Sequence, residues 1–353
     1  MHYTDLYKHF LFAIFLFLVS ATISWILIQR VKVLDIPNGR SSHNHSTPTI
    51  GGVAIVATFF LSMLIFYFVR EESMIMERYF LGFTFSSLLI AGMSLYDDLK
   101  KKPFYIRLLT HVLATIVVMS FGIIINKVNF PYNILFINNK FSGFASCFVT
   151  FWWIMGMINA YNFMDGLNGM AGGNAIITTV FFCIISFSQG SNFAYIVSYS
   201  LGVSVLGFLV FNFPKGKLFM GDVGSTFLGF AFATISIIAS LYDNAHTSLL
   251  VIPLLLFHFI YDTFFTFMRR LLKGENVFQA HRTHLYQLFN RMGYPHVIVT
   301  FFYYGVAILQ GFGAMWMVTI PGIERILVFV PFLIFQIVYT IIIVTCAKKR
   351  GLL

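Results

Sequence analysis

Long runs of apolar residues recur along this chain, separated by short polar segments. A helix needs about 20 apolar residues to cross a bilayer, whereas the strands of a membrane barrel alternate apolar and polar residues over about ten positions. The runs here do not alternate, so they predict membrane-spanning helices. By run length we predict spans near residues 8–29, 50–69, 79–96, 105–126, 144–164, 173–189, 194–213, 223–242, 248–268, 297–319 and 325–346.

The predicted fold is all-α: one polytopic helical membrane domain over residues 1–353, with about 11 transmembrane helices or, as the alternative count, about 10. The third and fourth spans are separated only by the short stretch Asp97–Phe104. The first run has no small-residue cleavage site and other spans follow it, so we expect a permanent span rather than a signal peptide. We find no soluble domain and no internal repeat.

Lysine and arginine are divided unevenly between the two sets of alternate loops. Of the 23 such residues, 17 fall in one set and 6 in the other. Loops rich in basic residues stay on the cytoplasmic side of a membrane. The sequence therefore predicts that the N-terminus is outside and the C-terminus is cytoplasmic.

Composition supports the membrane class and excludes several others. Hydrophobic residues make up 58% of the 353 residues and charged residues 10%, against about 25% charged in ordinary soluble domains. These values exclude a soluble domain, a disordered chain and a disulfide scaffold. The net charge of +10 indicates a basic face beside anionic lipid, and we expect no nucleic-acid binding. The three cysteines lie inside apolar runs without metal-ligand spacing.

Side chains that carry chemistry are concentrated in the loops predicted to be cytoplasmic. Asp97, Asp98, Asp165 and Asp222 each adjoin an apolar run, where a carboxylate is costly without a function or a partner. Together they would repel one another unless a cation bound, and oxygen ligands of this kind favour Mg²⁺ or Mn²⁺. Each could instead be a solvated residue or a helix cap, and Asp222 could be the N-cap of its span. The loops lie near 30–49, 97–104, 165–172, 214–222 and 269–296.

Two basic segments are candidates for phosphate binding. Lys100–Lys102 follow the aspartate pair after one leucine and serve either as cytoplasmic anchors or as cations for a diphosphate. His281 and His284 would share one face if their segment is helical, but no third soft ligand for zinc is nearby. We expect Arg282 to bind phosphate with the two histidines as polar contacts, and a solvated loop is the alternative.

Two further features leave alternatives open. Gly166 and Gly169 either let the backbone approach a phosphate closely or permit tight helix packing. His258 and Asp262, one helical turn apart in the ninth span, form either a buried pair or a polar contact on the lipid side.

Five motifs occur in a fixed order along the chain. They are Asp35-x-Pro-Asn38 with the following Pro48-Thr-Ile-Gly-Gly52, Asp97-Asp98, Asn162-Phe-Met-Asp165-Gly, Gly221-Asp222-x-Gly-Ser225 and the late histidine loop. In these motifs the chain resembles the polyprenyl-phosphate N-acetylhexosamine-1-phosphate transferases, which include the peptidoglycan enzyme that makes lipid I and the enzymes that initiate O-antigen synthesis. The lipid I enzymes resemble one another in three adjacent histidines, which this chain lacks, so it looks like the O-antigen-initiating branch.

The resemblance implies a reaction on the cytoplasmic face of a bacterial inner membrane. An N-acetylhexosamine-1-phosphate unit moves from a UDP-sugar to undecaprenyl phosphate, and UMP leaves. Because a phosphate monoester is already largely ionised at neutral pH, we favour direct attack without a covalent aspartate intermediate. Asp222 with Asn162 would hold Mg²⁺. Asp97, Asp98 and Asp165 would be catalytic, with one of the pair holding the acceptor's proton or orienting a lysine. The nucleotide and diphosphate would contact Asn168, Lys101, Arg282, His281 and His284, and the lipid phosphate would lie near Asn38, Arg40, Thr49 and Gly51.

The chain departs from the family pattern at one position, and several other functions are alternatives. Many bacterial members have aspartate where this chain has Asn168, a position associated with the uracil ring. A lipid-linked sugar flippase would also carry intramembrane acids, but it predicts polar residues near span centres. An inactive scaffold and lipid I synthesis are further alternatives. The aromatic and glycine-rich faces of the 144–164 and 297–319 spans fit either a homodimer or packing within one protomer.

Overall fold

The structure is a computed structural model. It describes residues 3–31, 33–36, 46–69, 75–100, 103–126, 143–243, 246–277, 279, 281–322 and 324–353. Three of the residues predicted for the site, Asn38, Arg40 and Lys101, lie outside these described residues.

The chain is almost entirely helical, as the apolar runs predict. Two short strands, β1 (Leu34–Asp35) and β2 (Thr47–Pro48), pair in antiparallel fashion just before the second helix. The helices are α1 (Tyr3–Arg30), α2 (Gly52–Val69), α3 (Glu77–Lys100), α4 (Phe104–Ser120), α5 (Gly143–Phe163), α6 (Met170–Gln189), α7 (Asn192–Asn212), α8 (Gly221–Leu241), α9 (Val251–Leu255), α10 (Phe257–Leu272), α11 (Leu285–Arg291), α12 (His296–Met317), α13 (Glu324–Leu327) and α14 (Phe329–Lys349).

Nine helices in the described part of the chain are long and apolar enough to cross a membrane. The all-α, multi-pass membrane class is therefore confirmed. Two predicted spans differ in detail. Helix α4 is shorter, and the predicted 248–268 span is divided into α9 and α10 because Leu256, at φ −110° and ψ 19°, leaves helical geometry. The total number of spans and their sidedness stay predictions.

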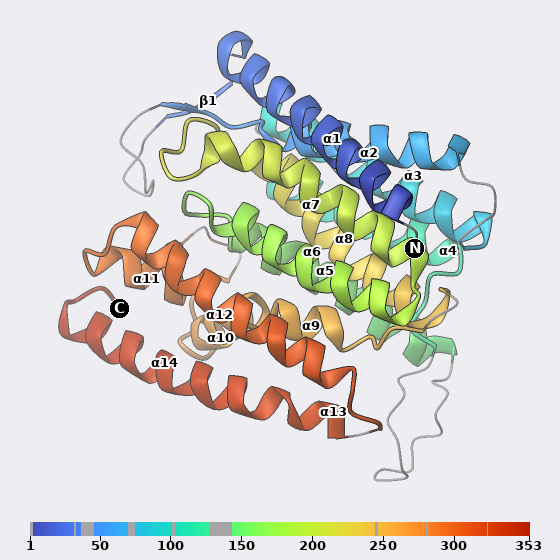
Figure 1. Ribbon diagram of the computed structural model, residues 1–353. Coiled ribbons are helices and arrows are strands. Elements are labelled where there is room, and N and C mark those ends of the chain that lie inside the picture. Colours follow the sequence, from blue (N-terminus) through green and yellow to red (C-terminus); the bar gives the residue numbers. More distant parts are fainter. Residues whose placement is uncertain are drawn as a thin grey trace.

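Helix α8 lies in the centre of the bundle, and α1 and α14 lie on opposite sides of it (Figure 1). Nearly all of α8 is buried, whereas α1 and α14 are largely exposed, as expected for helices that face lipid. Glycine permits this central packing. A Cβ on Gly229 would lie 2.6 Å from the Met157 carbonyl oxygen of α5, and one on Gly52 would lie 2.2 Å from the Gly224 amide of α8.

The ends of α2, α3, α4, α5 and α8 meet at one end of the bundle. The segment before α2 runs beside the segment before α8: the Gly51 amide donates to the Phe219 carbonyl, and the Phe219 amide donates to the Pro48 carbonyl, both at 2.8 Å. The two chain termini lie at opposite ends of the bundle (Figure 1). The loops predicted to be cytoplasmic therefore gather, where they are described, at one end.

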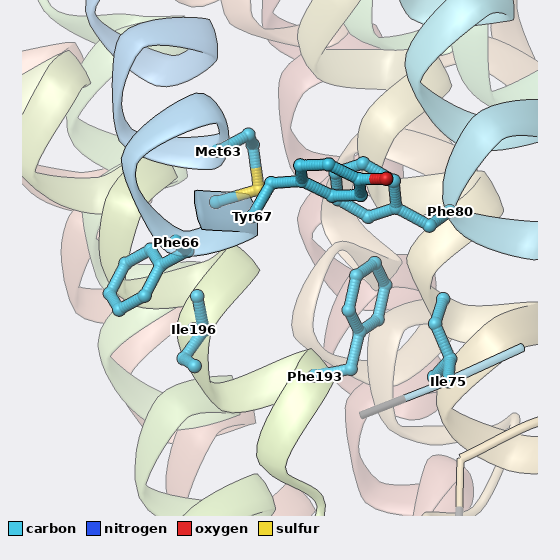
Figure 2. Close-up of a pocket in the computed structure, with 7 residues that line it drawn as sticks. All are labelled: Met63, Phe66, Tyr67, Ile75, Phe80, Phe193 and Ile196. Atoms are coloured by element: carbon cyan, nitrogen blue, oxygen red, sulfur yellow. The ribbon is translucent and has the colours of Figure 1, made fainter. Parts of the chain in front are cut away.

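An apolar pocket lies towards the other end of the bundle, between α2, α3 and α7 (Figure 2). Among the described residues, no charged side chain lines this pocket. The pocket lies far along α2 from Gly51 and Gly52, which contact the start of α8, so it is separate from the cluster of aspartates at that end. The residues that line it are Met63, Phe66, Tyr67, Ile75, Phe80, Phe193 and Ile196.

Candidate active site

Asp222 is the meeting point of three helices. It is the second residue of α8, where the backbone amides of the helix end favour negative charge. Asn162, in the last turn of α5, donates from Nδ2 to the Asp222 Oδ1 and to the Ser225 Oγ, each at 2.9 Å. Arg107 of α4 donates to the other carboxylate oxygen of Asp222. The pairing of Asp222 with Asn162 that the resemblance implies is thus present as a direct contact.

Arg107 was not among the predicted site residues, yet it joins two of the aspartates. Its Nε lies 3.3 Å from the Oδ2 of Asp97, and its Nη1 contacts Asp222. In the sequence it is one of the 17 basic residues of the loops predicted to be cytoplasmic. One sequence signal indicates its role: a cation in the first turn of a helix interacts unfavourably with the helix dipole, which suggests that an acidic partner compensates it. Arg107 is therefore a partner of both Asp97 and Asp222.

Asp98 caps the helix that carries Asp222. Its carboxylate accepts the backbone N–H groups of Asp222 at 3.2 Å and Val223 at 3.0 Å. The alternative that Asp222 is the N-cap of its own helix is therefore wrong, because α8 begins at Gly221 and the cap comes from α3. Gly221 has φ +72°, and a Cβ there would lie 2.1 Å from the Thr49 carbonyl oxygen. Only glycine permits this approach.

Asp165 lies in the loop between α5 and α6, three residues after Asn162. Burial first, and then the negative charge of Asp222, raise the pKa of Asp165 to about 7. The two carboxylates are therefore close enough to interact electrostatically. The protonated and ionised forms of Asp165 are thus nearly balanced at neutral pH when no cation is bound.

Thr49 and Gly51 lie beside this acidic cluster, but the described contacts give them packing roles. The Thr49 carbonyl oxygen faces Gly221, and a Cβ on Gly51 would collide with the Phe208 ring at 2.4 Å. Their part in binding a lipid phosphate stays a prediction.

Asn168 and Gly169 connect the α5–α6 loop to two other elements. The Asn168 Nδ2 donates to the Pro214 carbonyl at 3.1 Å, so the amide supports the turn that precedes α8. The Gly169 amide donates to the Asn212 Oδ1, and the Gly169 carbonyl accepts from the Tyr304 hydroxyl, both at 2.7 Å. These bonds fix the loop in which Asp165 lies. A contact of Asn168 with a nucleotide stays a prediction.

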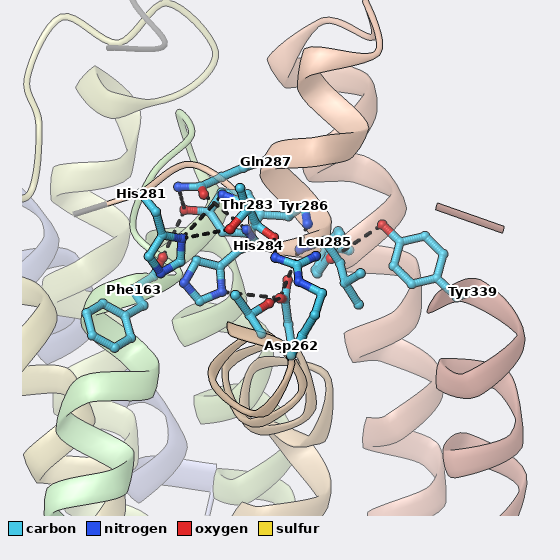
Figure 3. A network of polar contacts seen from close by, with 12 residues as sticks. Phe163, Asp262, His281, Thr283, His284, Leu285, Tyr286, Gln287 and Tyr339 are labelled. Atoms are coloured by element: carbon cyan, nitrogen blue, oxygen red, sulfur yellow. Dashed lines mark hydrogen bonds and ion pairs between the residues drawn. The ribbon is translucent and has the colours of Figure 1, made fainter. Parts of the chain in front are cut away.

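The late histidine loop is organised by Asp262, a role that the sequence left open (Figure 3). The Asp262 carboxylate is buried and accepts the backbone N–H groups of Leu285 at 2.9 Å and Tyr286 at 3.2 Å. It also lies 3.2 Å from the His284 Nδ1. Asp262 therefore caps α11 from α10. It does not pair with His258, whose ring nitrogens instead contact amide side chains of α6 and α12.

His281 and His284 precede α11 rather than lying on it, so the helical arrangement considered for them is wrong. Their rings nevertheless stack, with centroids 4.9 Å apart. The Tyr286 hydroxyl donates to the Phe163 carbonyl at 2.9 Å, which holds the loop against the end of α5 (Figure 3). The histidines are therefore placed beside the segment that carries Asn162 and Asp165.

His281 is a neutral group at physiological pH. Burial, the neighbouring His284 and nearby arginines lower the pKa of His281 to about 4. Its Nδ1 accepts from the Thr283 amide at 3.3 Å, as a neutral imidazole can. Arg282 stays a cation, and burial together with Arg291 lowers its pKa from the ordinary arginine value. This loop thus offers the Arg282 cation and the neutral imidazole of His281.

The oxygen atoms around Asp222 fit a hard divalent cation. No three histidine, cysteine, aspartate or glutamate side chains of the described residues lie close enough to form a metal site by themselves. Mg²⁺ does not need such a cage, because it commonly takes one or two carboxylates and completes its shell with water and substrate phosphates. The Asp222 carboxylate matches that pattern, and the 22% exposure of its side chain leaves it open to a ligand. Asn162 directs its Nδ2 at Asp222, so its amide would turn over to present the Oδ1 as a second ligand.

Comparison with known proteins identifies relatives of this chain. Residues 80–240 match glycosyl transferase family 4. The undecaprenyl-phosphate alpha-N-acetylglucosaminyl 1-phosphate transferase of Thermotoga maritima is 30% identical over 79% of this chain and 80% of its own. The probable undecaprenyl-phosphate N-acetylglucosaminyl 1-phosphate transferase of Bacillus subtilis is 28% identical over 76% and 72%. The phospho-N-acetylmuramoyl-pentapeptide-transferase of Petrotoga mobilis is 33% identical over 62% and 69%.

The fold and site therefore define a multi-pass membrane enzyme with an acidic centre at one end of its bundle. The chain belongs to glycosyl transferase family 4, the family of polyprenyl-phosphate N-acetylhexosamine-1-phosphate transferases. It is a glycosyl-1-phosphate transferase, a type of phosphotransferase.

Proposed function

We propose that this protein transfers N-acetylhexosamine-1-phosphate from a UDP-sugar to undecaprenyl phosphate and releases UMP. One observation carries the proposal: Asp97, Asp98 and Asp222, from two helices far apart in sequence, are held together by Arg107 and by the start of α8. Such a cluster can hold a divalent cation, and that cation together with Arg107 would offset the repulsion between two anionic phosphates that must approach each other.

In the proposed step, an oxygen of the acceptor phosphate attacks the sugar-linked phosphorus of the UDP-sugar. A new P–O bond forms, the bond from that phosphorus to the bridging oxygen breaks, and UMP leaves with the bridging oxygen. The product is a polyprenyl diphosphate sugar. A phosphate monoester is already largely ionised at neutral pH, since its second pKa is about 6. A strong general base is therefore not required.

We assign the divalent cation, Mg²⁺ or Mn²⁺, to Asp222 and Asn162. When bound there, the cation would neutralise charge on the diphosphate and on the transition state. Arg107 competes for the same Asp222 carboxylate, so it would release Asp222 and keep its contact with Asp97 as the cation binds. Asp98 keeps Asp222 in place through the backbone of α8. Asp165, with its raised pKa, would lose its proton as positive charge enters the site.

The remaining predicted contacts extend this site. Arg282 would support a phosphate, with His281 and His284 as polar contacts and Asn168 near the uracil. The predicted lipid-phosphate region before α2 adjoins the start of α8 through Thr49. The polyprenyl tail would then lie along the lipid-facing helices.

We further propose that the enzyme initiates O-antigen or another surface polysaccharide in a bacterial inner membrane, with its site on the cytoplasmic face. The absence of three adjacent histidines in the late loop supports this branch. A phospho-N-acetylmuramoyl-pentapeptide-transferase of Staphylococcus saprophyticus is 28% identical over 87% of this chain. Lipid I synthesis is therefore the second candidate, and the donor sugar decides between the two.

The test is UMP release in detergent from undecaprenyl phosphate and a panel of UDP-sugars that includes UDP-GlcNAc and UDP-MurNAc-pentapeptide. Native protein with Mg²⁺ is compared with protein in EDTA and with Asp222→Asn. We expect release with a UDP-N-acetylhexosamine that EDTA and the substitution abolish. Release only from UDP-MurNAc-pentapeptide would assign lipid I synthesis. No release with any donor, from protein shown to be folded, would favour a flippase or scaffold.

A further inference from the structure

His111 is a buried polar side chain without a partner. It lies on α4, four residues after Arg107, and only 5% of its surface is exposed. Neither of its ring nitrogens has a hydrogen-bond partner among the described residues. A buried polar group left unpaired costs about 1–3 kcal/mol of stability. A side chain kept at such a cost indicates that a partner meets it in another state of the protein.

The surroundings of His111 narrow the choice of partner. Residues four apart on a helix lie on one face, and helical side chains lean towards the N-terminus, so the His111 ring lies over the turn that carries Arg107. The charges that act on this ring are those of Asp222 and Arg107. The hydroxyl groups about one helical turn from Asp97 and Asp222, those of Ser94 on α3 and Thr226 on α8, already bond to each other at 2.9 Å.

Cation binding at Asp222 would change the contacts of Arg107. In the described structure the guanidinium holds both Asp97 and Asp222. A divalent ion and a guanidinium repel each other on one carboxylate, so Arg107 loses its contact with Asp222 when the ion binds. The freed N–H groups of the guanidinium then need an acceptor. A neutral imidazole nitrogen is one, and it is present one helical turn away.

We propose that His111 is a positioning residue that accepts a hydrogen bond from Arg107 when a divalent cation takes Asp222. This inference rests on the metal site of the proposed function. His111 stabilises the arrangement in which Arg107 has left Asp222, and it thereby favours cation binding without touching the cation.

The test is a double-mutant cycle read by Mn²⁺ binding, with free Mn²⁺ measured by electron paramagnetic resonance on the purified full-length protein. The variants are H111L, H111Q, R107Q and R107Q with H111L. One hydrogen bond corresponds to about a three- to ten-fold change in affinity. We expect H111L to weaken Mn²⁺ binding by about that factor, and H111Q, which keeps an acceptor, to restore it. In the R107Q background H111L should have no effect.

Two results would overturn the inference. One is wild-type affinity in H111L; the other is the same loss with and without Arg107, which would indicate a general structural role. Thermal unfolding in EDTA is a second readout, and H111L should be at least as stable as wild type because the ring has no partner there to lose. Failure of the proposed function can be distinguished from failure of this inference. In that case the wild-type protein itself would bind no Mn²⁺, or EDTA would leave UMP release intact.

Discussion

Asp98 of α3 holds the start of the helix that carries Asp222, by accepting the backbone N–H groups of Asp222 at 3.2 Å and Val223 at 3.0 Å. A carboxylate next to the proposed metal ligand thus has a defined structural task. It positions the ligand through the backbone rather than through the cation. This relationship separates the two aspartates of the pair, since Asp97 faces Arg107 instead.

Asp98→Ala should reduce both stability and activity. Loss of a helix cap costs about 1–2 kcal/mol, and a displaced Asp222 should lower UMP release by about 100-fold, the cost of about a 1 Å error at a reacting centre. Thermal unfolding and steady-state rates measure the two effects. Glu77→Gln, at the other end of the same helix, is the matched control and should leave the rate unchanged. A fully active Asp98→Ala protein would contradict this role.

Asp165→Asn should stabilise the cation-free protein at high pH. The folded-state pKa of about 7 lies above the ordinary value of 3.8, so the folded protein binds this proton more tightly than the unfolded chain. The associated stability is fully present below pH about 4 and is lost as the pH rises to about 7. In EDTA, the unfolding temperature of Asp165→Asn should therefore exceed that of wild type by a few degrees at pH 8, and the two should converge at pH 4.

The comparison for this prediction is Glu324→Gln, which removes a carboxylate from α13, away from the acidic cluster. Its unfolding temperature should follow that of the wild type at both pH values. A wild-type protein that is more stable than Asp165→Asn at pH 8 would show that the ionised carboxylate is favoured in the folded state, contrary to the account.

Arg107→Gln should separate cation binding from catalysis. Removal of the guanidinium frees the Asp222 carboxylate from a competing positive charge, so Mn²⁺ should bind about three- to ten-fold more tightly. The same substitution removes a cation that offsets phosphate repulsion, and kcat should fall by about 100-fold or more. Arg107→Lys keeps a charge without the two-pronged geometry and should be intermediate in rate. Weaker Mn²⁺ binding in Arg107→Gln would exclude competition at Asp222.

Asp262→Ala should release the histidine loop. It removes the acceptor of two buried backbone N–H groups at the start of α11, and each one left unpaired costs about 1–3 kcal/mol. We expect a lower unfolding temperature and a loss of UMP release. Thr266→Val, which removes only the hydroxyl that donates to Asp262 at 3.1 Å, keeps the α11 contacts and should retain most activity. Equal losses in both variants would argue against the capping role.

Much of the fold followed from local patterns. Apolar run length located most helices within a few residues, because a membrane span needs a fixed length of apolar chain. The division of the 248–268 span into α9 and α10 was missed, since continuous hydrophobicity persists through Leu256 although its backbone leaves the helix. The length of an apolar run indicates that a segment lies in lipid, but it does not determine the backbone dihedral angles within that segment.

The site was less accessible to sequence reasoning than the fold. Motif order pointed to Asp222 and Asn162, and the structure places their side chains 2.9 Å apart. The contributions of Arg107 and Asp262 were not found, because each depends on contacts with residues far away in the chain. A charge count treats Arg107 as one more loop cation. Only the packing of α4 against α3 and α5 places it between two carboxylates.

The most direct test of the central claim follows the phosphorus atom next to the sugar. Protein in detergent is given UDP-GlcNAc, or the donor found in the panel, labelled with ³²P at that phosphorus, together with undecaprenyl phosphate and Mg²⁺. The account predicts that the label moves to the lipid fraction while unlabelled UMP forms in equal amount, and that Asp222→Asn blocks both. Label recovered in water-soluble UDP, with only the sugar on the lipid, would contradict transfer of the sugar-1-phosphate unit.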